Sequence, residues 1–208
     1  MSADMITIGV LALQGDFIEH EAALRSVSAD TRQVRTSDDL RGLDGLILPG
    51  GESTTFCRLL DDFRLYDPLR AFVLSGVPVW GTCAGMIVLA RQANGLPFPT
   101  LEAIDVEVDR NAYGRQVDSF ESDIRVPVLG EQRFHAVFIR APVIVSIGER
   151  VEVLASCRRE AGEPERAVAV RQGHVLATSF HPELTSDWRF HRYFLDMVKQ
   201  REGRAVAK

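Results

Sequence analysis

Short, continuous apolar runs alternate with longer helical patterns through the first half of this 208-residue sequence. The runs lack the in–out alternation of a half-exposed strand, so each predicts a strand buried on both faces. Four strands are predicted, at 6–13, 31–35, 43–51 and 77–80. Three helices are predicted, at 16–27, from Ser53 to about Leu74 with a break near Asp67-Pro68, and at 85–93. This alternation favours a doubly wound α/β fold, a mostly parallel sheet flanked by helices.

The second half of the sequence is richer in strands. Six strand-like segments are predicted, at 103–110, 123–128, 133–141, 151–157, 166–172 and 174–180. A helix is expected from Ser186 to Gln200, followed by a polar tail at 201–208. The length and the 46% hydrophobic content suffice for one buried core, so we expect a single domain over residues 1–200.

Charge and cysteine usage exclude several classes of protein. The net charge is −5 and no basic block is present, which argues against nucleic acid or an anionic membrane as a partner. No apolar run approaches the roughly 18 residues of a membrane helix, and no secretion signal is recognised. The three cysteines show neither disulfide nor metal-ligand spacing. We therefore expect a cytoplasmic protein without a metal or a bound cofactor.

The most informative stretch is GTCAG, residues 81–85, between an apolar strand and an apolar helix. It is the thiol form of the G-x-S-x-G elbow, in which a nucleophile occupies a strained strand-to-helix turn. Small residues two positions before and after the nucleophile, Gly81 and Gly85, give that turn room. Cys83 would stand at a helix amino end that favours the thiolate, and the Ala84 N–H could donate to an oxyanion. The alternative is a structural cysteine beside a glycine-rich turn, which is how we interpret Cys57 and Cys157.

A thiol nucleophile needs a base, and His181 is the best candidate among five histidines. It ends an apolar strand, and Pro182 keeps it extended, so Glu183 can orient its ring as the third member of a triad. The alternative is an ordinary strand end in which Glu183 caps the next helix. His20, between Glu19 and Glu21, is expected on a solvated helix face.

A third motif, PGGES at 49–53, follows a predicted strand. Its glycines let a backbone N–H turn toward a ligand, so Gly51 is a candidate for the second oxyanion donor. The alternative is a tight turn that feeds a helix capped by Ser53.

In the order PGGES, GTCAG and HPE, these motifs resemble the class I (triad-type) glutamine amidotransferases. Three more segments, at 10–20, 110–120 and 138–142, resemble the glutaminase subunits of the two-component pyridoxal phosphate synthases. The resemblance covers about Ile6 to Lys199. It implies a flavodoxin-like fold and hydrolysis of L-glutamine to glutamate and ammonia by Cys83, His181 and Glu183. By position, the resemblance also implies a set of glutamine-binding residues, namely Gly51, Glu52, Ser53, Arg110, Ile139 and Arg140.

The same resemblance implies a partner. It would be a barrel-fold synthase subunit in a large hetero-oligomer, which combines the ammonia with a pentose phosphate and a triose phosphate. Pyridoxal phosphate would be the product of the pathway. Arg110 could hold the substrate carboxylate, order its loop or form a surface salt bridge.

Three other functions are weighed against this one. The chain could feed ammonia to a different synthase, which changes the partner and leaves the triad unchanged. It could be a stand-alone thiol hydrolase of γ-glutamyl amides. It could also be a non-catalytic docking subunit, against which the intact Cys83, His181 and Glu183 argue.

Overall fold

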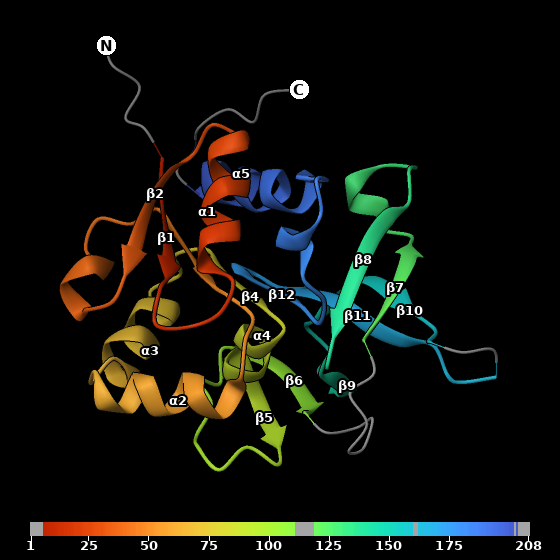
Figure 1. Cartoon of the computed structure of the whole chain (residues 1–208), viewed down its shortest axis with the longest axis horizontal. Helices are drawn as coiled ribbons and strands as arrows, with labels where there is room; N and C mark the ends of the chain where they lie inside the picture. Colours follow the sequence, from red (N-terminus) through yellow and green to blue (C-terminus); the bar gives the residue numbers. More distant parts are fainter. Residues whose placement is uncertain (1–5, 111–118, 160–161, 202, 204–208) are drawn as a thin grey trace.

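The computed structural model of the chain describes residues 6–110, 119–159, 162–201 and 203 (Figure 1). Its centre is a seven-stranded sheet. In spatial order the strands are β10 (Glu152–Cys157), β11 (Arg166–Gln172), β12 (Val175–Thr178), β4 (Val79–Thr82), β3 (Gly45–Leu48), β1 (Thr7–Leu11) and β2 (Asp30–Val34). The five strands from β12 to β2 run parallel, and β10 and β11 are antiparallel additions at one edge.

Helices cover both faces of this sheet, as the apolar strands require. One face carries α1 (Phe17–Ser26) and α5 (Arg189–Arg201) (Figure 1). The core beneath them contains side chains such as Ile47 and Trp80. The other core packs α2 (Ser53–Asp62), α3 (Tyr66–Leu74) and α4 (Ala84–Leu89) against the alternate side chains, such as Leu46 and Val79. The predicted doubly wound α/β fold is therefore confirmed.

Two smaller sheets extend the second half of the chain. The first is three-stranded, in the order β5 (Ala90–Asn94), β6 (Ile104–Asp109) and β9 (Val143–Ile147). The second is the antiparallel pair of β7 (Ser119–Ile124) and β8 (Phe134–Ile139). Short 3-10 turns complete the chain, η1 (Ser37–Leu40), η2 (Pro127–Leu129) and η3 (Pro182–Leu184).

The long helix predicted after Ser53 is two helices, and its break lies earlier than predicted. Arg64 adopts a left-handed φ of 54°, which ends α2 and starts a new turn. Pro68 lies in the first turn of α3, where the missing N–H has no intrahelical partner to lose. The cap was also predicted wrongly. Glu52, not Ser53, is the N-cap of α2, and its carboxylate accepts hydrogen bonds from the N–H groups of Thr54 and Thr55.

Three other boundaries differ from the prediction. The helix predicted at 85–93 ends at Leu89, and the next five residues form β5 because they pair with β6. The strand predicted at 123–128 lies earlier, as β7, since Pro127 cannot donate to a ladder. A separate strand, β9, was not predicted. The expected C-terminal helix is observed three residues later, as α5, and includes Arg201. Residues 202 and 204–208 of the predicted tail lie outside the described residues.

Candidate active site

The three sequence motifs meet at the carboxyl ends of neighbouring parallel strands. Gly50 and Gly51 follow β3, Cys83 follows β4, and His181 follows β12 by three residues. These three strands are adjacent in the sheet, so their ends lie at one edge. Ligands bind at this edge in open α/β sheets.

Cys83 occupies a strained elbow between β4 and α4. Its φ of 47° and ψ of −102° lie outside the regions that non-glycine residues ordinarily adopt. Both flanking glycines are sterically required. A Cβ on Gly85 would lie 2.0 Å from the carbonyl oxygen of Leu48, and a Cβ on Gly81 would lie 2.6 Å from the Gly85 carbonyl. The structure therefore bears out the steric reason given for the G-x-C-x-G pattern.

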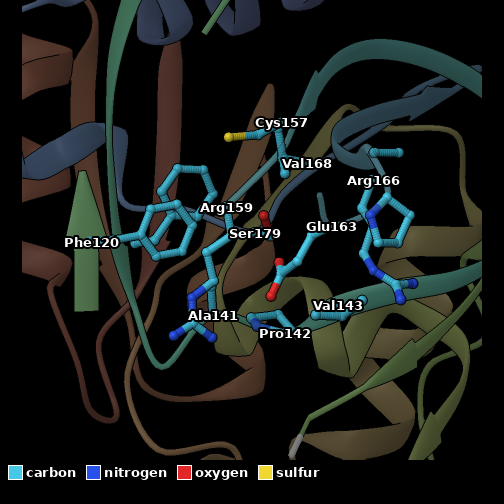
Figure 2. A pocket seen from close by; sticks show the side chains of 13 residues that line it. Phe120, Ala141, Pro142, Val143, Cys157, Arg159, Glu163, Arg166, Val168 and Ser179 are labelled. Atoms are coloured by element: carbon cyan, nitrogen blue, oxygen red, sulfur yellow. The ribbon is translucent and has the colours of Figure 1, made fainter. Parts of the chain in front are cut away.

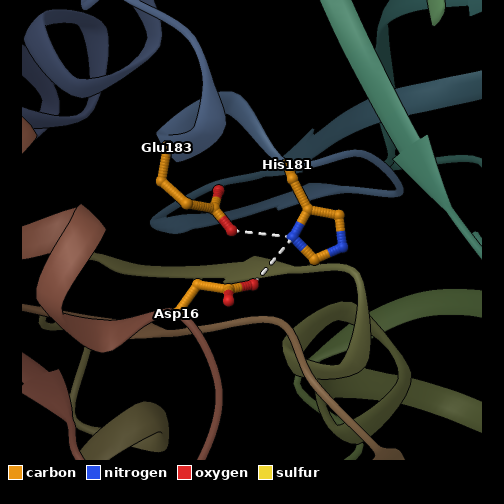
Figure 3. Close-up of side chains that lie close together, drawn as sticks. All are labelled: Asp16, His181 and Glu183. Carbon is orange, nitrogen blue, oxygen red and sulfur yellow. Dashed lines mark hydrogen bonds and ion pairs between the residues drawn. The ribbon is translucent and has the colours of Figure 1, made fainter.

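His181 lies beside two carboxylates (Figure 3), and it lines the same cavity as Cys83. Its Nδ1 is 2.8 Å from Glu183 Oε1 and 3.1 Å from Asp16 Oδ2, and its other ring nitrogen points away from both. The only hydrogen bond of the Cys83 sulfur among the described residues is with the Ile139 carbonyl, and its effect on the ring of His181 is electrostatic. Burial disfavours the imidazolium, but the contacts with Asp16, Cys83 and Glu183 outweigh it and raise the pKa of His181 to about 12. The geometry suits a proton acceptor for the thiol.

The carboxylate that contacts His181 Nδ1 is buried, as the proposed role of orienting this ring would require. Glu183 is 4% exposed and lies in the turn η3. Burial is the largest cause and raises the pKa of Glu183 above its ordinary value, although the contact with His181 opposes the shift. Asp16, at the amino end of α1, is partly exposed and was not recognised from the sequence. In a single sequence, nothing in the preceding residues 13–15 marks Asp16 as a partner of a distant histidine.

A buried histidine pair lies behind Glu183. His20 of α1 and His191 of α5 are both 0% exposed, and His20 Nδ1 is 3.0 Å from His191 Nε2. The expectation of a solvated His20 is therefore wrong. A signal was available in the sequence, because His20 lies three residues after Phe17 and four before Leu24, on the apolar stripe of α1.

The loop after β3 is held by Gln14 and by the cap of α2. The Gln14 side chain donates to the Gly50 carbonyl at 3.2 Å and accepts from the Glu52 N–H at 3.1 Å. Gly51 has a φ of 133°, which glycine adopts without strain. Burial opposes ionisation of Glu52, but hydrogen bonds from Thr54 and Thr55 outweigh it and lower the pKa of Glu52 to about 2. The loop is thus fixed by a charged cap.

A cavity of about 310 Å³ opens beside Cys83 and His181. Six more of its lining residues are those named from the resemblance, Gly51, Glu52, Ser53, Arg110, Ile139 and Arg140. Arg110 donates to Thr54 Oγ1 at 2.8 Å and lies 3.3 Å from Glu52 Oε1, and the Ile139 carbonyl is 3.8 Å from the Cys83 sulfur. Ala84, the other proposed oxyanion donor, is the first residue of α4 and is buried. Residues 111–118 of the segment that follows Arg110 lie outside the described residues.

Two other features near these residues are less suited to a substrate. A cavity of about 20 Å³ between Phe120, Cys157 and Ser179 has room for little more than a water molecule (Figure 2). Asp16, His181 and Glu183 offer ligand atoms within 4.8 Å of one another, as a metal site would. Their atoms already engage one another through His181 Nδ1, so we assign no ion there.

Comparison with known proteins agrees with this geometry. A model of the SNO glutamine amidotransferase family matches residues 10–200. The chain belongs to this family. The motif-based resemblance to glutamine amidotransferases is therefore confirmed over most of the chain.

Named proteins are similar to this chain in both sequence and structure. A pyridoxal 5'-phosphate synthase subunit PdxT from Herpetosiphon aurantiacus is 54% identical, covering 92% of this chain and all of the relative. The PdxT of Pelotomaculum thermopropionicum is 52% identical over 91% of this chain and 93% of the relative. A crystal structure of a glutamine amidotransferase, 50% identical, superposes with a TM-score of 0.81 over 92% of this chain and 98% of its own.

The fold extends beyond these near relatives. The structure of PurLQS from Thermotoga maritima is 17% identical and has a TM-score of 0.72, over 94% of this chain and 100% of its own. Among the described residues, every helix is too short or too polar to cross a membrane.

Proposed function

We propose that Cys83, His181 and Glu183 form the catalytic triad with which this chain hydrolyses L-glutamine to glutamate and ammonia for pyridoxal 5'-phosphate synthesis. The glutaminase assignment follows from family membership and from relatives, about 50% identical, that are named as subunits of that synthase. The observation that carries the triad is a strained Cys83 that lines one cavity with His181, whose Nδ1 is held by Glu183 at 2.8 Å.

The reaction would proceed in two steps. His181 removes the thiol proton, and the Cys83 sulfur attacks the γ-carboxamide carbon of glutamine. His181 then gives its proton to the leaving nitrogen, so ammonia departs and a γ-glutamyl thioester remains. In the second step His181 takes a proton from water, the hydroxide attacks the thioester, and glutamate leaves as the thiol is restored. Glu183 keeps the imidazole oriented throughout.

Substrate binding would use the cavity beside the thiol. We assign glutamine binding to Gly51, Glu52, Ser53, Arg110, Ile139 and Arg140. Backbone groups of the Gly51 loop and of Ile139 suit the amide, and the guanidinium groups of Arg110 and Arg140 suit the carboxylate. In this structure Arg110 binds Glu52 and Thr54, which supports a role in ordering the loop as well.

The oxyanion would be held by the N–H groups of Ala84 and Gly51. Gln14 holds the Gly50 carbonyl, and Gly51 can adopt backbone conformations closed to other residues. Docking of the synthase could therefore complete the hole by a local rotation at Gly50-Gly51.

The partner is the other subunit of the two-component synthase named by the relatives. We propose that it has a barrel fold and assembles with this chain into a large hetero-oligomer that receives the ammonia. We also place the reaction in the cytoplasm. The thiols of Cys57, Cys83 and Cys157 are all free, which fits a reducing compartment.

Glutamate release from L-glutamine, measured with and without the synthase subunit, tests this function. We expect activity that rises with the synthase and falls below about one thousandth in Cys83→Ala, because the nucleophile is lost. Cys57→Ala is the matched control and should retain activity. Activity independent of the synthase would favour the stand-alone thiol hydrolase, and absence of activity in every mixture would favour the docking subunit.

A further inference from the structure

One oxygen of the triad carboxylate faces a residue that the mechanism has not used. Glu183 Oε1 contacts His181, whereas Glu183 Oε2 lies 3.3 Å from Nε2 of His20. Both side chains are fully buried. Within the described part of the chain, no hydrogen bond of ordinary geometry reaches Glu183 Oε2. The nearby N–H dipole of His20 therefore offsets part of the cost of burying this oxygen.

The surroundings of His20 fix which of its nitrogens carries the proton. Nε2 faces Glu183 Oε2 and, at 3.2 Å, the hydroxyl of Thr82. A carboxylate only accepts hydrogen bonds, so Nε2 is the protonated nitrogen and Nδ1 accepts from the Nε2–H of His191, 3.0 Å away. This leaves His191 Nδ1 as an acceptor with no hydrogen-bond partner among the described residues.

His20 is held neutral in this position. Burial is the largest cause, and together with His191 and His181 it lowers the pKa of His20 well below the ordinary value. A neutral imidazole with a fixed tautomer presents a dipole, not a charge, to the carboxylate. The dipole of His20 thereby stabilises the ionised carboxylate of Glu183, which keeps its attraction for the imidazolium of His181.

We propose that His20 is a positioning residue for the triad, with its Nε2–H lying beside the second oxygen of Glu183 so that this carboxylate stays ionised and turned toward His181. The proposal rests on the proposed function of the triad. It assigns a role to α1, which the sequence motifs leave out of the chemistry.

The consequence of losing His20 follows from burial. A buried carboxylate without a donor at Oε2 takes up a proton more readily, and a neutral Glu183 no longer favours the imidazolium of His181. The thiolate–imidazolium pair would then form only at higher pH. Among the described residues, the other titratable groups beside His20, Glu183 and His181 are Asp16, next to His181, and His191, next to His20.

The test compares His20→Leu, which fills the site without a donor, with His20→Gln, whose amide N–H can replace Nε2–H. The rate at which iodoacetamide alkylates Cys83, followed on the Cys83 peptide by mass spectrometry, is measured from pH 4 to 9. The acid limb of this profile is the pH range over which the alkylation rate rises. In His20→Leu we expect this limb to move up by about one pH unit. We also expect kcat with the synthase to fall about tenfold, at unchanged KM. His20→Gln should recover most of both losses.

Two further variants keep the test decisive. His174→Leu removes a ring whose Nε2 lies 2.8 Å from the Val73 carbonyl, and it should leave the limb in place. If His20→Leu does not fold, His191→Phe frees His20 Nδ1 and should move the limb in the same direction by less. A limb unmoved in folded His20→Leu overturns the inference alone. If Cys83 of the wild-type chain were alkylated with the pH dependence of a free cysteine, that result would instead count against the triad.

Discussion

At the scale of single residues, the site depends on glycines at positions where a side chain would clash with its neighbours. Gly50 is buried against the His181 ring, and a Cβ there would lie 2.3 Å from Cε1 of this ring. Its φ is not in the left-handed region, so alanine is compatible with the backbone. We expect Gly50→Ala to fold but to displace the His181 ring, which would lower kcat in the synthase complex by about 100-fold.

Gly42 provides the control for this substitution. It has a φ of 70°, lies on the surface, and a Cβ there would meet nothing within 4 Å. Gly42→Ala should therefore cost about 1 kcal/mol of stability from backbone strain and leave kcat unchanged. Steady-state kinetics and thermal unfolding of both variants separate the effects. Equal kcat in Gly50→Ala and the wild type would show that the ring adapts to the added methyl group.

At the scale of elements, one helix cap also lines the cavity proposed to bind glutamine. Glu52 caps α2 through Thr54 and Thr55 and also lies beside Arg110 at the cavity. Removing the carboxylate in Glu52→Ala should cost about 1 kcal/mol and release the loop at Gly51. We therefore expect the KM for glutamine, measured in the synthase complex, to rise about tenfold or more.

Asp39 is a comparable cap far from the cavity. Asp39, the third residue of η1, accepts from the N–H groups of Arg35 and Thr36, which precede this turn, at 3.0 and 2.8 Å. Asp39→Ala should lose a similar stability while KM stays at the wild-type value. If the two variants changed KM equally, the effect of Glu52 would be general destabilisation.

The elements also show how far a single sequence can be interpreted. The β3, β4 and β12 strands and the residues that follow them were predicted because buried parallel strands and elbow turns leave strong local patterns. The β5 strand was not, since Ala90–Asn94 becomes a strand only by pairing with β6, a contact that local pattern does not encode. His20 was misplaced because its neighbours Glu19 and Glu21 dominated the interpretation. Asp16 approaches His181 across 165 residues of sequence, which no local pattern reports.

At the scale of the whole molecule, two buried histidines make stability depend on pH. Burial lowers the pKa of His191 to about 3 from an ordinary 6.5, so it stays neutral in the fold. The unfolded chain binds a proton at this histidine below pH 6.5, and the folded chain does not until about pH 3. The stability is therefore complete above pH 6.5 and decreases as the pH falls through that window, with His20 acting in the same direction.

Replacement of His191 isolates this contribution. Relative to pH 7, the wild-type chain should lose about 2 kcal/mol at pH 5 through this residue alone, a loss that His191→Phe should not show. Urea unfolding at a series of pH values measures the difference. His135 gives a control of opposite sign. Hydrogen bonds to Asp123 are the main cause that raises its pKa, so its contribution is present below pH 6.5 and is lost as the pH rises. In His135→Gln the stability should therefore fall more steeply toward pH 5. Parallel pH profiles for the wild type and His191→Phe would mean that His191 is protonated, or reached by water, within the folded core.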